Sequence, residues 1–234
     1  IHVPVGTAES PVNVYGGGAT GSRVLGESTL TIGDGARIYG DVYGGGQSQT
    51  GESSLHIQGG LIEGNAYGGG NHSDTAGNVT VTQSGGSITG HLYGGANQAS
   101  VHGNIELHQT AGAVNGSLYG GSATSGTVKG QVSIDVSGSS ASVFGGGSGQ
   151  QTAVENGTRI NINPGARIAM DVYGGGEDRS VTSGGTSINL SGTAPSGSVF
   201  GGGKHADVTG PVSIQSMEGS AVPAIFGGAL HSGT

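Results

Sequence analysis

The sequence predicts an all-β protein whose chain winds into a parallel β-solenoid of about nine coils, each of ~26 residues with glycine-rich corners. Three observations carry this prediction. Nine of the ten aromatic residues recur at intervals of 24–29 residues, an alternating apolar and polar run recurs in most of these intervals, and glycine supplies 54 of the 234 residues. No stretch shows a helical period, so we expect essentially no helix. The recurring aromatic positions are Tyr15, Tyr43, Tyr67, Tyr93, Tyr119, Phe144, Tyr173, Phe200 and Phe226.

The elements follow the same order in each coil. A glycine leads into an alternating run, such as residues 26–32 (GESTLTI) or 51–57 (GESSLHI), which places one face in a core and the other in water. A second turn and a short apolar pair follow, and the coil closes on a motif such as DVYGGG, found at 41–46 and again at 171–176. Strands this short cannot form a free-standing sheet, so each is expected to pair with its equivalents in neighbouring coils.

The domain organisation follows from where the motif starts. Residues 13–234 are predicted to form one β-solenoid repeat domain. Residues 1–12 precede the first motif and are expected to be an N-terminal cap or the remainder of a longer array. We expect the chain to be a fragment of a longer protein, because it stops just after a ninth motif.

The triple glycine is explained by the corners of such a stack. Glycine reaches positive φ without a Cβ clash and lets coils approach at the ~4.8 Å spacing of paired strands. The aromatic beside it has two interpretations. Strict alternation points Tyr43 or Tyr93 outward, where a ladder of rings would suit sugar stacking, whereas a ring next to a sharp turn can fold inward. We favour burial, because Phe replaces Tyr freely.

Composition excludes several classes of partner. The net charge is −8 with seven Lys and Arg, which leaves no basic surface for nucleic acid or anionic lipid. Cysteine is absent, so there are neither disulfides nor thiolate metal sites. No apolar run reaches the ~18 residues of a membrane helix, so this chain is not expected to insert into a membrane.

Neither a catalytic site nor a cofactor site is predicted. Asp41 and Asp171 share a position in the repeat but lie five coils apart, so they cannot act together on one glycosidic bond. His205 and His231 share a position in adjacent coils, but two histidines without a third ligand do not predict a metal site. We therefore expect no enzyme activity, no metal and no cofactor.

The segment after the glycines varies in length and content while the rest of the coil is monotonous. Variable loops on a rigid scaffold are where recognition usually occurs. A charge pair across coils is expected there, because Glu177 and Asp178 precede Lys204 and His205 by one repeat. The candidate binding residues on these loops are Asn71, His72, Asn97, Gln98, Glu177, Asp178, Lys204 and His205.

The repeat, V-[YF]-G-G-G closing a V-x-I-x-x-G-G-x-I-x-G coil, resembles the right-handed parallel β-helix passenger domains of bacterial autotransporters and related cell-surface adhesins. The resemblance implies right-handed coils and a location outside the cell, on the bacterial surface. It also implies that a rigid rod binds a host glycan or protein, or identical molecules on neighbouring cells. A polysaccharide-acting β-helix enzyme and a passive structural spacer are the alternatives.

Overall fold

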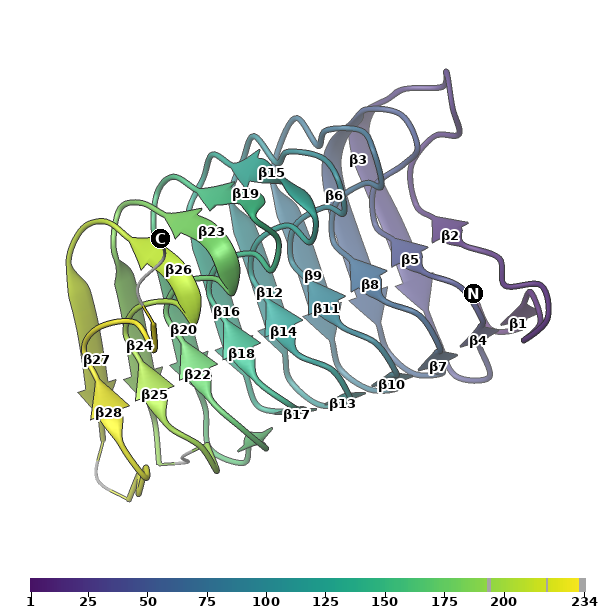
Figure 1. Cartoon of the computed structure of the whole chain (residues 1–234). Helices are drawn as coiled ribbons and strands as arrows, with labels where there is room; N and C mark the ends of the chain where they lie inside the picture. The colour runs from purple at the N-terminus through teal and green to yellow at the C-terminus, as the bar shows by residue number, and fades with distance from the viewer. Residues whose placement is uncertain (193–194, 218, 232–234) are drawn as a thin grey trace.

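The chain is all-β and forms a parallel β-solenoid of about eight turns, as the sequence predicts (Figure 1). The computed structural model describes residues 1–192, 195–217 and 219–231. In Figure 1 the colour advances from coil to coil along the rod, so each coil packs against the coils before and after it. No helix occurs in the described residues, and none long and apolar enough to cross a membrane is found among them.

The longest strands form an eight-stranded sheet along one side of the rod, which we call the long-strand sheet. Its pairs are parallel and in register, with Leu55 opposite Val81 and His56 opposite Thr82. In β6 and β9 the residues alternate between buried and partly or fully exposed over the run that the sequence predicts, whereas β27, the last strand of the sheet, is largely exposed. The strands are β3 (Val24–Ile32), β6 (Thr50–Ile57), β9 (Val79–Gln83), β12 (Ile105–Gln109), β16 (Val132–Val136), β20 (Thr158–Ile162), β24 (Thr186–Leu190) and β27 (Val212–Ser216).

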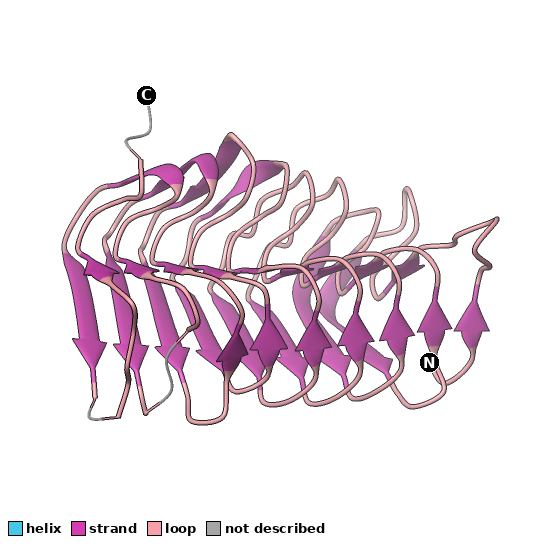
Figure 2. Cartoon of the chain, turned by 60° about the horizontal axis from the view of Figure 1, so that its bottom comes forward, coloured by secondary structure: helices cyan, strands magenta, loops and turns pink. Residues whose placement is uncertain are grey.

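Two sheets of two-residue strands complete each coil (Figure 2). The seven-stranded one, the short-strand sheet, contains β1 (Pro4–Val5), β4 (Arg37–Ile38), β7 (Leu61–Ile62), β10 (Ser87–Ile88), β13 (Ala113–Val114), β17 (Ser139–Ser140) and β21 (Arg167–Ile168). The nine-stranded one, the aromatic sheet, contains β2 (Val14–Tyr15), β5 (Val42–Tyr43), β8 (Ala66–Tyr67), β11 (Leu92–Tyr93), β14 (Leu118–Tyr119), β18 (Val143–Phe144), β22 (Val172–Tyr173), β25 (Val199–Phe200) and β28 (Ile225–Phe226).

The variable segments after the glycines contain a fourth sheet that the sequence did not predict. From the fifth aromatic motif onward these segments pair with one another as parallel strands. We call this layer the loop sheet, and its residues Val128 and Val154, which pair with one another, are buried. Its strands are β15 (Ser125–Val128), β19 (Gln151–Val154), β23 (Asp178–Thr182) and β26 (His205–Val208).

Two separate apolar columns run along the rod. The larger is built from the inward aliphatic residues of the three main sheets, such as Ile57, Ile62 and Val42. The second consists of the motif aromatics, with Ala123 packed against them. The aromatic follows an inward residue and therefore points away from the first column, yet from Tyr43 to Phe200 these side chains are only 1–7% exposed. The prediction of burial is confirmed, and an exposed ladder of rings is excluded.

The motif glycines are required by close contact between coils. A Cβ on Gly68 would lie 2.3 Å from the carbonyl oxygen of Gly94 in the next coil, and 2.5 Å from Val79 Cγ1. The other part of the expectation, positive φ, is wrong for the described motif glycines, none of which has a left-handed backbone. Positive φ occurs instead at the turn before the short-strand sheet, at Gly60, Gly86 and Gly112.

The coil between Tyr119 and Phe144, the short coil, breaks the regular pattern. It has Ala141 where other coils have Gly64, Gly90 and Gly116, because the Ala141 amide donates to the Gly116 carbonyl just as the Gly116 amide donates to Gly90. It lacks a residue equivalent to Asn115, whose amide donates to Ile88 in the preceding coil. In the following coil Met170 occupies the glycine position and is 50% exposed. The rod is therefore irregular at this corner, and two hollows in its surface border it.

Candidate functional site

A groove of about 500 Å³ runs over the edge of the aromatic column, beside the short coil. One wall comes from the residues that precede the strands of the aromatic sheet, and the other from the segments after the motif glycines. We call it the aromatic groove. Its lining residues are His91, Tyr93, Ser117, Tyr119, Ser142, Phe144, Ser148, Met170, Asp171, Tyr173, Glu177 and Lys204.

The first wall is held by side chains that bond the backbone of the next coil. The Ser117 amide donates to His91 Nδ1 at 2.9 Å, so this nitrogen carries no proton. The Ser198 amide donates to Asp171 Oδ1 at 2.7 Å. Asn13, Asp41 and Asn65 accept in the same way at the equivalent positions of earlier coils. In these five coils the Asn, Asp or His before the aromatic strand therefore ties two coils together and fixes this wall.

The floor is made of ring edges. Adjacent aromatics stack with centroids 4.7–5.0 Å apart and planes within 4–10° of parallel, so each ring covers the face of its neighbour. Tyrosine hydroxyls on these edges bond to the groove walls, and Tyr173 donates to Asp171 at 3.0 Å. Phe144 carries no hydroxyl, which leaves an apolar place in the floor between Tyr119 and Tyr173.

The second wall contains the charged pair that the sequence predicts. Lys204 Nζ lies 2.8 Å from Glu177 Oε1, which confirms the expected contact across coils. The other carboxylate oxygen of Glu177 accepts from the Tyr119 hydroxyl at 2.5 Å, two motifs away. Burial first, and then the bond to Glu177, raises the pKa of the Tyr119 hydroxyl. Glu177 therefore holds the loop against the aromatic column, with Lys204 beside it in the groove.

The remaining predicted residues lie outside this groove. Asn97 donates to Asn71 at 2.9 Å and accepts from Thr124 at 3.0 Å, which makes a polar ladder along the loops. His72 and Gln98 are exposed next to that ladder. The eight candidates therefore lie in three places rather than at one site: the groove, this polar ladder and the loop sheet.

The last two candidates, Asp178 and His205, lie on the loop sheet. They are opposite one another in register and both exposed. The His205 ring stacks on the His231 ring with centroids 4.8 Å apart, as expected for one position in adjacent coils. Within the described parts of the chain, no three His, Asp or Glu side chains gather to hold a metal ion.

Sequence reasoning missed most of the groove. None of the three groove residues His91, Tyr119 and Asp171 is among the eight predicted binding residues. One signal was present in the sequence: Ala141 and Met170, in successive coils, stand in a position that is glycine in most other coils. The comparisons with known proteins find no matching family model, no matching curated protein and no matching solved structure.

Proposed function

We propose that this chain is part of an extracellular adhesin on a bacterial surface, and that it binds glycan through the aromatic groove without acting as an enzyme. The observation that carries the proposal is the chemistry of the groove. It combines a lysine, two carboxylates and several hydroxyls around an apolar floor, which suits a ligand with many hydroxyls and apolar ring faces. The extracellular location rests on the resemblance of the repeat to autotransporter passengers.

Binding is favoured over catalysis by the partners of the two carboxylates. Asp171 accepts from Tyr173 and from a backbone amide, and Glu177 accepts from Tyr119 and Lys204. A general acid in glycoside hydrolysis must be free to deliver a proton to the leaving oxygen. These side chains act instead as fixed acceptors, which orient a lysine and hydroxyls toward a ligand.

The test is a glycan array and a cell-binding assay, run beside sedimentation at several concentrations. Glu177→Gln and the pair Lys204→Ala with His205→Ala are expected to weaken glycan binding about tenfold or more, because a charge-assisted hydrogen bond contributes ~1.5–3 kcal/mol. The pair Asn71→Ala with His72→Ala, on loops outside the groove, is the matched control and should bind normally.

Other outcomes would replace the proposal. Association of rods without glycan binding would assign the function to contacts between identical molecules. Loss of binding only in the Asn71 and His72 variant would move the site to the polar ladder. Neither binding nor association would leave a passive spacer, and release of reducing sugar would revive the polysaccharide-acting enzyme.

A further inference from the structure

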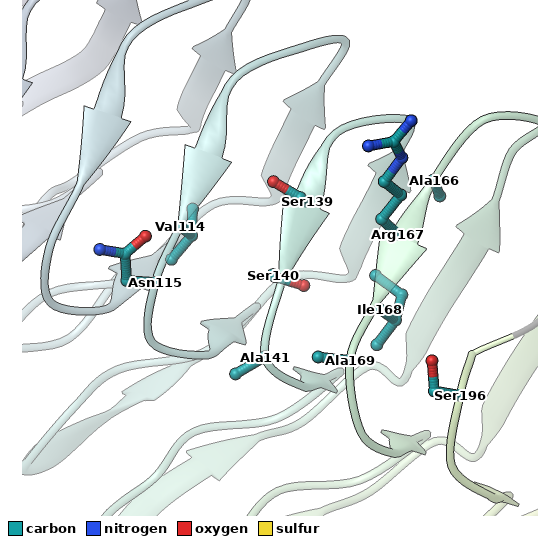
Figure 3. A pocket seen from close by; sticks show the side chains of 10 residues that line it. All are labelled: Val114, Asn115, Ser139, Ser140, Ala141, Ala166, Arg167, Ile168, Ala169 and Ser196. Atoms are coloured by element: carbon teal, nitrogen blue, oxygen red, sulfur yellow. The ribbon is translucent and has the colours of Figure 1, made fainter.

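A second hollow lies on the opposite side of the irregular corner, on the outer surface of the short-strand sheet (Figure 3). It has a volume of about 610 Å³, which is within the usual range for small-molecule sites. Small side chains make most of its surface. The lining residues are Val114, Asn115, Ser139, Ser140, Ala141, Ala166, Arg167, Ile168, Ala169 and Ser196.

In an earlier coil, side chains of the protein itself fill the space that corresponds to this hollow. Residues 36–43 (ARIYGDVY) and 166–173 (ARIAMDVY) match except at two positions, and Arg37 and Arg167 each begin a strand of the short-strand sheet. Arg37 is engaged on two sides. Its guanidinium lies 5.0 Å from the centroid of the Tyr39 ring and 2.6 Å from the Glu63 carboxylate of the next coil.

Both of these partners are missing at Arg167. Ala169 stands where Tyr39 stands in the earlier coil. Ser196 stands where Glu63 stands, because its amide donates to Ile168 at 2.8 Å just as that of Glu63 donates to Ile38. In the described parts of the chain, the Arg167 guanidinium has no ion pair and no hydrogen bond. The hollow therefore corresponds to the space that the Tyr39 ring and the Glu63 carboxylate fill in the earlier coil.

The strand beneath the hollow also departs from the repeat, because it has a serine at an inward position. Ser140 is only 5% exposed, and its Oγ has no hydrogen-bond partner in the described structure. A buried hydroxyl without a partner costs ~1–3 kcal/mol. Ser140 pairs with Ile168 and therefore faces the aliphatic column beneath the hollow. The equivalent residues of the other coils are Val5, Ile38, Ile62, Ile88, Val114 and Ile168.

We propose that this hollow binds a small aromatic carboxylate. The carboxylate pairs with Arg167 as Glu63 pairs with Arg37, and the ring lies over Ala169 against the guanidinium as Tyr39 does. Arginine suits this ligand because its planar guanidinium can bond a carboxylate and stack on a ring at the same time.

The proposal is tested with 3-(4-hydroxyphenyl)propionate, using calorimetry and ligand-observed NMR. The intact chain should bind it, and Arg167→Gln should weaken binding at least about tenfold. The double variant Ala169→Tyr with Ser196→Glu rebuilds the Arg37 arrangement and should abolish binding while keeping the circular dichroism of the intact chain. Arg37→Gln is the matched control and should bind normally.

Two further probes identify the source of the carboxylate. N-acetylglycyl-tyrosine represents the C-terminus of a polypeptide, and its C-terminal amide should not bind because it lacks the charge. Binding of the dipeptide acid alone would assign the site to a polypeptide end, and binding of the free aromatic acid would assign it to a small molecule. The proposal is overturned if neither acid binds at about 10 mM, or if the rebuilt double variant binds as tightly as the intact chain.

Discussion

Adding one methyl group to a motif glycine tests whether close contact between coils is the reason for the glycines. Gly145 and Gly227 both follow a phenylalanine and begin the same motif, but only Gly145 has a further coil packed on it in the described structure. A Cβ on Gly145 would lie 2.1 Å from the Gly174 carbonyl oxygen, whereas a Cβ on Gly227 would meet nothing within 4 Å. Neither glycine has a left-handed backbone, so substitution by alanine introduces a steric contact without backbone strain.

The size of the effect follows from that distance. Ordinary contact begins at 3.4 Å, so the two atoms must separate by about 1.3 Å, which the stacking of Phe144 on Tyr173 at 4.7 Å resists. We expect Gly145→Ala to lower the free energy of unfolding by about 3 kcal/mol, and the melting temperature by roughly 6–12 °C. Gly227→Ala should stay within ~0.5 kcal/mol of the intact chain.

Urea and thermal unfolding followed by circular dichroism measure both variants. Hydrogen exchange at the amides of β18 and β22 shows whether the loss is local to the altered coil, as expected when each coil contacts only its neighbours. Equal stability of the two variants would refute the argument that contact between coils selects glycine here.

Three other predictions concern buried polar groups. Ser140→Val should raise the free energy of unfolding by about 1–2 kcal/mol in a thermal melt, because valine, as at Val114, replaces a hydroxyl without a partner; a less stable variant would contradict this. Tyr119→Phe should cost about 1.5 kcal/mol in urea and speed exchange at the Glu177 amide, because the carboxylate loses its donor; unchanged exchange would show that the loop is held otherwise. Burial raises the pKa of five tyrosines, so the unfolded state loses the phenolic protons at a lower pH than the folded state does. Their contribution to the free energy of unfolding is therefore fully present below pH ~10 and is lost as the pH rises further. Tyrosinate absorbance should then rise together with unfolding, and ionisation of a still folded chain would contradict the prediction; the five are Tyr43, Tyr67, Tyr93, Tyr119 and Tyr173.

The architecture could be predicted from the sequence because the same pattern of residues recurs in every coil of a solenoid. The contact between Glu177 and Lys204 could also be predicted, because the two residues have the same phase in adjacent repeats. The contact between Glu177 and Tyr119 could not, since it joins residues 58 positions apart at different phases. Burial of the rings could be predicted, but which loop covers which ring could not, because the repeat pattern carries no information on that.

The two hollows show a different limit. Each hollow depends on residues that depart from the repeat. Such residues are set aside when the repeat is being identified from the sequence. Ser140 resembles an ordinary variation in the sequence, and its meaning depends on the six aliphatic residues that occupy the same position. Ala169 gains significance only beside the contacts that Tyr39 makes. In a solenoid of this kind, departures from the consensus repeat are therefore the positions at which to search for a site.

Register between adjacent coils also has a consequence for how the chain folds. Residues that pair across coils, such as Tyr67 with Tyr93, are separated by about one repeat wherever they lie in the rod. A separation of ~26 residues in a chain of 234 gives a relative contact order of about 0.11, which is typical of helical bundles rather than β-sandwiches. Adding coils would lengthen the rod without lengthening any loop that must close. We therefore expect this all-β chain to fold quickly, from one nucleus of adjacent coils that extends toward both ends.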